Sequence, residues 1–126
     1  ELAALFDAEE VRLAEFIATV ERNEHVEAIE RFYAPHASMQ ENNAPPRVGR
    51  DVLVAHEAAA LARLSKMDTQ PAVMLLHDGD NVVIQWVFLM TNKTGETLRF
   101  EELTHQVWEG DRIVRERFFY DSRQFG

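Results

Sequence analysis

The chain of 126 residues is 46% hydrophobic and 28% charged, the composition of an ordinary globular protein, and we expect a single domain over residues 1–126. Its 22 acidic and 13 basic residues give a net charge of −9, which repels nucleic acids and anionic membranes and so excludes both as partners. The absence of cysteine excludes thiolate chemistry, and no apolar run approaches the roughly 20 residues that span a bilayer.

The first third of the chain has the pattern of two helices. Asp7 and Glu10 have the spacing of a capping box, and apolar residues then recur at helical intervals as far as Asn23. A second helix follows and ends before Pro35, because proline disfavours helical geometry in the residue that precedes it. Together they predict a helical hairpin.

A short extended stretch is predicted at residues 38–41, followed by a loop at 42–46 that is rich in asparagine and proline. A third helix then begins with Asp51 as its N-cap and runs to Leu64. Four strands follow, at 71–77, 82–90, 97–108 and 112–120, separated by turns that each contain a glycine. Helices first and hairpin-linked strands afterwards predict an α+β domain with an antiparallel meander.

The strand at 97–108 carries polar groups on both of its faces. One face holds Phe100, Glu102, Thr104, Gln106 and Trp108, and the other holds the residues between them. A polar group among apolar neighbours costs free energy unless it is paired, so such a mixed face is typical of a ligand cavity.

Four segments in this order, FYAP at 32–35, VGRD at 48–51, WEGDRI at 108–113 and RFFYD at 117–121, resemble the nuclear transport factor 2-like superfamily. Within it, the chain most resembles the SnoaL-like polyketide cyclase branch. The resemblance implies a cone-shaped roll, in which three N-terminal helices pack on a strongly curved, mostly antiparallel mixed sheet around a hydrophobic pocket. The superfamily holds many chemistries as well as inert subunits, so individual residues must carry the functional argument.

Two branches of the superfamily supply matching positions. By resemblance to ketosteroid isomerases, Glu41 occupies the position of the general base, whereas Phe16 and Thr104 stand where those enzymes have their two oxyanion donors. Steroid-type isomerisation is therefore disfavoured. By resemblance to SnoaL-like cyclases, Asp121 occupies the acid/base position of an intramolecular aldol closure. An epoxide hydrolase relay can be assembled only loosely, from Asp121, Arg117 and Glu102.

Each candidate carboxylate also has an ordinary structural explanation. Glu41 can be a solvated carboxylate at a strand edge. Asp121 can cap the last strand and pair with Arg123 or Arg117. Glu102 shares its face with Thr104, which favours the pocket, but cross-strand pairing with an arginine explains it equally well. Aromatic residues on strands are more often core than pocket.

The leading hypothesis is a cofactor-free acid/base enzyme of the cyclase, isomerase or dehydratase type, acting on a small hydrophobic carbonyl compound through Glu41, Glu102 or Asp121. The five histidines lack the spacing of metal ligands, so we expect no metal. The expected pocket residues are Phe16, Tyr33, Met39, Trp86, Phe88, Thr104, Gln106, Trp108, Phe118 and Tyr120.

The alternative is a non-catalytic binding or interaction module. Val83, Val87 and Leu89 share the predicted outer face of one strand, and a monomer rarely exposes such a patch, so a homodimer through the outer face of the sheet is expected. The cysteine-free sequence, without a signal-peptide pattern, is expected in the cytoplasm.

Overall fold

The computed structural model describes residues 8–126 and contains three helices before the main run of strands, as expected. Helix α1 spans Ala8–Glu21, α2 spans His25–Phe32 and α3 spans Arg50–Ala62. Helix α1 buries Leu13, Phe16 and Val20, whose helical spacing predicted it. The capping residue expected before α1, Asp7, lies outside the described residues.

Seven strands form one mixed sheet. They are β1 (Tyr33–Glu41), β2 (Arg47–Val48), β3 (Leu64–Thr69), β4 (Met74–Asp78), β5 (Asn81–Asn92), β6 (Thr97–Glu109) and β7 (Arg112–Phe119). The order is β2-β1-β7-β6-β5-β3, with β4 also paired to β5. Only β1 and β7 run parallel; the other pairs are antiparallel, and β4 to β7 form the expected meander.

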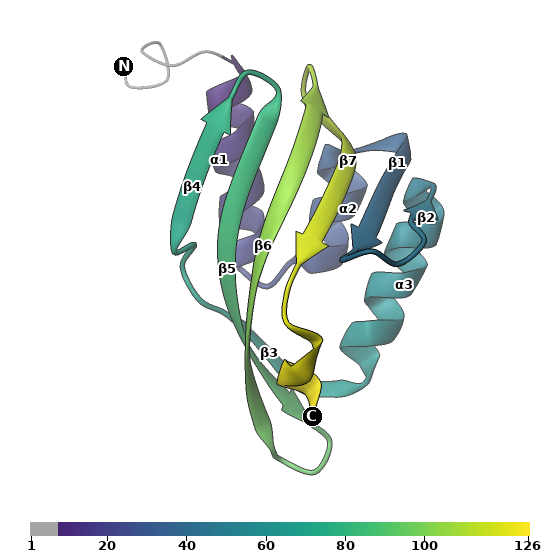
Figure 1. Ribbon diagram of the computed structural model, residues 1–126, viewed down its shortest axis with the longest axis vertical. Coiled ribbons are helices and arrows are strands. Elements are labelled where there is room, and N and C mark those ends of the chain that lie inside the picture. Colours follow the sequence, from purple (N-terminus) through teal and green to yellow (C-terminus); the bar gives the residue numbers. More distant parts are fainter. Residues whose placement is uncertain (1–7) are drawn as a thin grey trace.

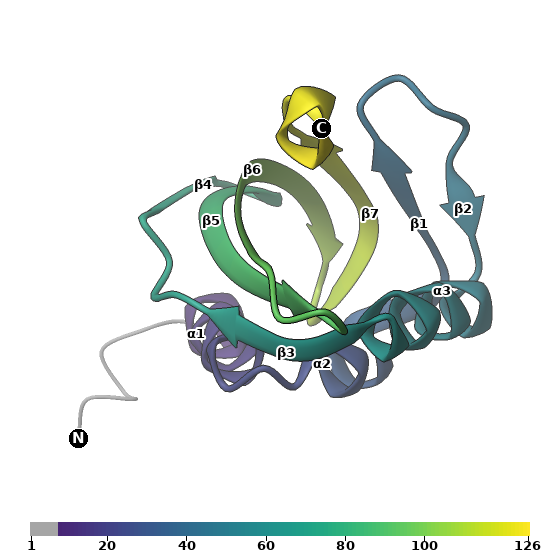
Figure 2. The same cartoon turned by 90° about the horizontal axis from the view of Figure 1, so that it is seen from below.

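The sheet curls along its two longest strands, β5 and β6, and two short strands share the outer edge of β5. Strand β4 pairs with the first half of β5, and β3 pairs with its second half. Viewed along the strands, the sheet forms a half-barrel, and the three helices lie along its open side (Figures 1 and 2). This arrangement confirms the α+β cone that the sequence predicts.

Three local predictions were wrong. Strand β1 begins at Tyr33 and includes Pro35, which the parallel ladder with β7 accommodates through a register shift between Tyr33 and Ser38. The N-cap of α3 is Gly49, at a φ of 105° that disfavours other residues, and Asp51 lies in the first turn. Strand β3 was not predicted because its polar sequence, LSKMDT, lacks the alternation of a half-buried strand.

The concave face of the sheet and the helices enclose the core. On β6 the inner face includes Phe100, Thr104, Gln106 and Trp108, all buried, which confirms the predicted alternation. Beyond β7, a short 3-10 helix, η2 (Ser122–Phe125), ends the chain. Among the described residues, no helix is long and apolar enough to cross a membrane.

Candidate functional site

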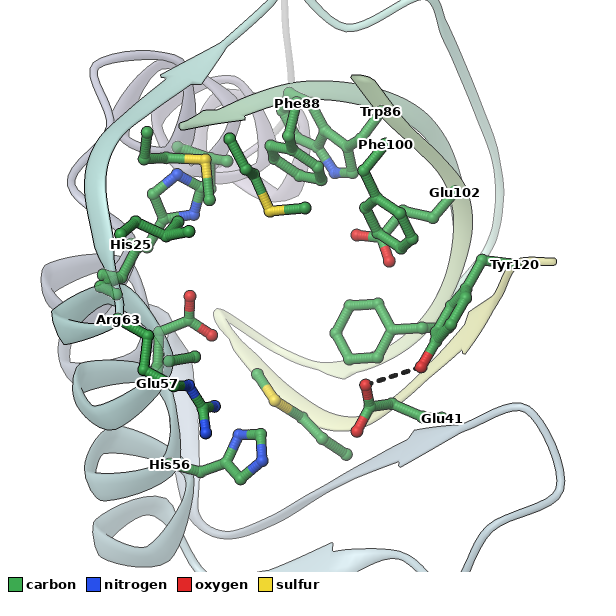
Figure 3. Close-up of a pocket in the computed structure, with 18 of the residues that line it drawn as sticks. His25, Glu41, His56, Glu57, Arg63, Trp86, Phe88, Phe100, Glu102 and Tyr120 are labelled. Atoms are coloured by element: carbon green, nitrogen blue, oxygen red, sulfur yellow. Dashed lines mark hydrogen bonds between the residues drawn. The ribbon is translucent and has the colours of Figure 1, made fainter. Parts of the chain in front are cut away.

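A cavity of about 700 Å³ lies between the concave face of the sheet and the helices. Seven of the residues expected in a pocket line it: Phe16, Tyr33, Met39, Trp86, Phe88, Phe118 and Tyr120. Figure 3 shows aromatic side chains on the β5 and β6 side and polar side chains of α3 on the opposite side. The volume is in the usual range for small-molecule sites.

Aromatic rings form a continuous wall on the sheet side. Trp86 and Phe88 lie nearly parallel, with ring centroids 6.0 Å apart, and Phe88 and Phe100 repeat this arrangement at 6.4 Å. Tyr120 meets Phe100 edge to face, and Phe125 from η2 packs against both rings. These contacts give the cavity a rigid apolar surface that favours a flat, hydrophobic ligand.

Glu41 lies at the end of β1 and lines the cavity. Its carboxylate accepts a hydrogen bond of 2.6 Å from Arg47 Nη1 and one of 2.9 Å from the Tyr120 hydroxyl (Figure 3). Partial burial alone would raise its pKa, but these two hydrogen bonds outweigh burial and lower it. The structure thus presents Glu41 as an ionised carboxylate held in a fixed orientation.

Glu102, on the inner face of β6, also lines the cavity. Among residues 8–126 its carboxyl group has no hydrogen-bond or ion-pair partner, so the arginine pairing considered as the alternative to a pocket role is not observed. Burial raises its pKa well above the ordinary value of 4.5, and the neighbouring Glu116, Glu57 and Glu41 raise it further. Burial therefore favours the protonated form of Glu102.

The most buried carboxyl group belongs to Glu116 on β7, which the sequence analysis missed. Its side chain accepts hydrogen bonds from the Tyr33 hydroxyl, from Thr104 Oγ1 at 2.8 Å and from Gln106 Nε2 at 2.7 Å. Trp108 Nε1 donates in turn to Gln106 Oε1 at 3.0 Å. We call these five residues the Glu116 network. Burial raises the pKa of Glu116, although the three donors partly oppose this.

Three residues expected in the pocket lie outside its lining. Thr104, Gln106 and Trp108 are buried on the inner face of β6, where their polar groups form hydrogen bonds within the Glu116 network. They do not line the cavity. The signal that would have revealed Glu116 is its parity, because it lies two residues before Phe118 and points to the same face of β7.

The helical side of the cavity carries further polar groups that were also missed. Glu57 of α3 points into the cavity, and His56 and Arg63 lie beside it (Figure 3). Glu57 lies four residues after the buried Leu53, so helical periodicity would have placed it on the inner face. Burial raises its pKa, and so does the charge of Glu116.

Arg47 brings a positive charge to the cavity at the end where Glu41 lies. Its Nη1 binds Glu41, but its buried Nε has no hydrogen-bond partner among the described residues. A buried donor without an acceptor costs about 1–3 kcal/mol, so this group favours a ligand that supplies an oxygen.

Asp121 does not line the cavity. It precedes η2, where its side chain accepts hydrogen bonds from Arg123 N at 2.9 Å and from the Arg123 guanidinium at 2.8 Å and 3.0 Å. These bonds lower its pKa. The pairing with Arg123 considered in the sequence analysis is thus the one observed, and Asp121 is not positioned to act on a ligand in this cavity.

Among residues 8–126, no three of the histidine and acidic side chains are grouped so that they could hold a metal ion. The lining groups that can act on a ligand include Glu41, whose ionised form is favoured, Glu102, whose protonated form is favoured, and the arginine donor Arg47. Environments that drive two carboxyl pKa values apart are typical of a base and an acid in one site.

The family model described as SnoaL-like domain matches residues 13–116. The fold is similar to that of an NTF2-like protein of unknown function from Burkholderia pseudomallei, with a TM-score of 0.80, 12% identity, and 95% of each chain covered. It is also similar to proteins assigned as polyketide cyclases from Jannaschia sp. (TM-score 0.77, 13% identity, 92% of this chain and 90% of that one) and Acidithiobacillus ferrooxidans (0.76, 18%, 94% and 91%). None of the curated proteins matches the chain.

Proposed function

The chain belongs to the SnoaL-like domain family, and we propose that its cavity binds a small hydrophobic carbonyl compound on which Glu41 and Glu102 transfer protons without a cofactor. The observation that carries this proposal is the presence of two carboxyl groups of opposite character in one aromatic-lined cavity. Glu41 is held by two donors, and Glu102 has none.

Glu41 acts as the base. Its carboxylate is ionised, and the hydrogen bonds from Arg47 and Tyr120 fix its orientation. It removes a proton from the carbon next to the carbonyl group, and the electron pair of that C–H bond moves toward the carbonyl oxygen. A carboxylate with a lowered pKa is a weak base, which favours substrates whose proton is already acidic.

Glu102 acts as the acid. A neutral carboxyl group can donate a hydrogen bond to the oxygen on which negative charge develops, and the proton can pass to it to form an enol. The unpartnered Nε of Arg47 supplies a second donor. These groups replace the oxyanion donors that the chain lacks at Phe16 and Thr104. The enol or enolate then attacks a second carbonyl or is reprotonated elsewhere, as a cyclase or an isomerase requires.

The test follows hydrogen exchange in a model ketone. The C1 protons of 2-tetralone lie between a carbonyl group and an aromatic ring, and their replacement by deuterium in D2O is followed by NMR. We expect the protein to accelerate this exchange, and Glu41→Gln to reduce the acceleration by about 100-fold or more, the usual contribution of a positioned base.

Glu101→Gln is the matched control, because it removes the adjacent carboxylate from the opposite face of β6, where it pairs with Arg99. This variant should exchange the ketone at the wild-type rate. Binding of 2-tetralone without any accelerated exchange would contradict catalysis and leave the cavity a binding site only.

The alternative, a dimeric binding module, is favoured by one observation. Leu103 and Phe119 are paired on the outer face of the sheet and are 40% and 41% exposed, and Leu76 of β4 is 58% exposed. Of the residues first expected there, Val87 is buried within the chain itself. We propose that a second copy covers this face in the cytoplasm.

Sedimentation at micromolar concentration tests this dimer. The wild type should sediment as a dimer, and Leu103→Glu should dissociate it. A monomeric wild type would contradict the proposed dimer.

A further inference from the structure

The lining of the cavity has an excess of carboxyl groups. Two arginines line it, Arg47 and Arg63. The side chain of Arg47 already pairs with Glu41. Five glutamates line the same cavity: Glu41, Glu57, Glu96, Glu102 and Glu116. A ligand that enters therefore meets a negative or proton-bearing surface, which disfavours anionic substrates.

Glu57 is the one cavity carboxyl group on a helix, and neither proposed proton transfer uses it. It projects from α3 toward the cavity, across from Glu102 on β6 (Figure 3). Among residues 8–126, Glu57 has neither a hydrogen-bond donor nor an ion-pair partner. Its carboxyl group is half-buried and faces the cavity, so a ligand can supply the donors that the protein does not.

The charged groups around Glu57 do not neutralise it. Glu116 faces it from β7 and Glu41 from β1, and both disfavour its ionisation, whereas Arg47 favours it. His56 of α3 and Arg63, the residue that follows this helix, also line the cavity, but neither forms an ion pair with Glu57. Glu57 therefore has no paired cation among residues 8–126.

We propose that the ligand carries a protonated amine on its hydrophobic body and that Glu57 binds this amine. The inference rests on the proposed function only in that it uses the same ligand cavity. An ammonium group brings both the N–H donors and the positive charge that Glu57 lacks, whereas a hydroxyl group brings a donor alone. An anion would be repelled.

The opposite wall supports the same ligand class. Trp86, Phe88 and Phe100 present aromatic rings to the cavity, and the negative faces of such rings attract cations as well as apolar groups. An amine bound at Glu57 leaves the other end of the ligand free to place its carbonyl oxygen near Glu102 and Arg47.

The experiment compares three ligands that share one bicyclic body and differ in charge: 2-aminotetralin, 2-tetralone and tetralin-2-carboxylate. At pH 7.5 the amine is a cation, because aliphatic amines titrate near pH 10. Their dissociation constants are measured by titration calorimetry on the full chain. We expect the amine to bind at least tenfold more tightly than the ketone and the carboxylate to bind least tightly.

Variants of one helix then locate the amine. Glu57→Gln should bring the affinity for the amine to that for the ketone, without changing the affinity for the ketone, which also shows that the variant is folded. Glu57→Asp keeps the charge and should retain part of the preference. Asp51→Asn removes a carboxylate from the exposed first turn of the same helix and should keep the preference in full.

Equal affinity of the wild type for amine and ketone would overturn the inference, and so would a preference that survives in Glu57→Gln. Either result is separable from the proposed catalysis. Accelerated exchange of 2-tetralone without a preference for the amine would support the proton transfer and reject the amine site. A preference for the amine without accelerated exchange would do the reverse.

Discussion

The Glu116 network and two glutamates outside it, Glu57 and Glu102, carry the same functional group in different surroundings. Glu116 is 3% exposed, and three side-chain donors surround its carboxyl group. Glu57 and Glu102 line the same cavity and have no donor from residues 8–126. Burial raises the pKa of all three. They therefore differ in hydrogen bonding rather than in the direction of their pKa shifts.

This difference separates a structural role from a binding role. The Glu116 network joins β1, β6 and β7, so its hydrogen bonds stabilise the curvature of the sheet. A network whose groups are all paired has little to gain from a ligand. Glu57 and Glu102, whose carboxyl groups have no donors within the protein, have more to gain, and for that reason we propose ligand binding for Glu57 and proton donation for Glu102.

The largest expected effect comes from removing the acceptor of the network. Glu116→Ala would leave the hydroxyls of Tyr33 and Thr104 and the amide of Gln106 buried without their partner. We expect the free energy of unfolding to fall by about 3–5 kcal/mol, the cost of breaking a buried polar cluster from one side. Urea denaturation measures this change.

Glu102→Gln is the control for that substitution, because it changes a carboxyl group on the same sheet that has no partner to lose. At about pH 4, where Glu102 is mostly protonated in both the folded and the unfolded state, we expect its free energy of unfolding to stay within about 1 kcal/mol of the wild type. If both substitutions cost the same, hydrogen bonding would not distinguish the two regions and our assignment of roles would fail.

A smaller effect is expected in the pH dependence of stability. The unfolded chain ionises Glu102 near its ordinary pKa of 4.5, while the folded protein keeps the proton to a higher pH. Between these two pKa values the folded state binds more protons than the unfolded chain. The contribution of Glu102 to the free energy of unfolding therefore falls as the pH rises above about 4.5. Glu102→Gln removes this contribution, and the variant should lose less stability than the wild type between pH 5 and pH 8.

Glu41 should behave in the opposite way. Its pKa is lowered in the folded state, so its contribution is present above the ordinary value of 4.5 and is lost as the pH falls. Glu41→Gln should therefore weaken the loss of stability on acidification. Thermal melts of Glu102→Gln between about pH 5 and pH 8 and of Glu41→Gln below about pH 4.5 check the two signs. Effects of the same sign would contradict the acid and base roles.

Most of the fold could be predicted from the sequence. Periodic apolar residues located α1 and the meander, and the order of four short segments indicated the family that residues 13–116 match. Strand β3 could not be predicted, because an edge strand is specified by its partner, β5, rather than by its own sequence. The early start of β1 was missed for a similar reason, since its ladder with β7 tolerates Pro35.

The site was predicted less completely. Alternation on β6 placed Glu102 on the inner face. It could not show that Thr104 and Gln106 donate their side-chain hydrogen bonds to Glu116. That network depends on the register of β6 and β7, which are neighbours and which place Gln106 directly opposite Glu116. Sequence periodicity gives the face of a residue, whereas its hydrogen-bond partners depend on the register between strands.

The smallest expected effect concerns Asp121, which resembles the acid/base residue of the cyclase branch by sequence. In the structure its carboxylate is bound to Arg123 outside the cavity, and its side chain is 49% exposed. Asp121→Asn should therefore leave both the binding and the exchange of 2-tetralone unchanged within error. A large loss of exchange would mean that the end of the chain rearranges to bring Asp121 into the cavity. The loss should then disappear if Phe125, the residue of η2 that lines the cavity, is replaced by alanine.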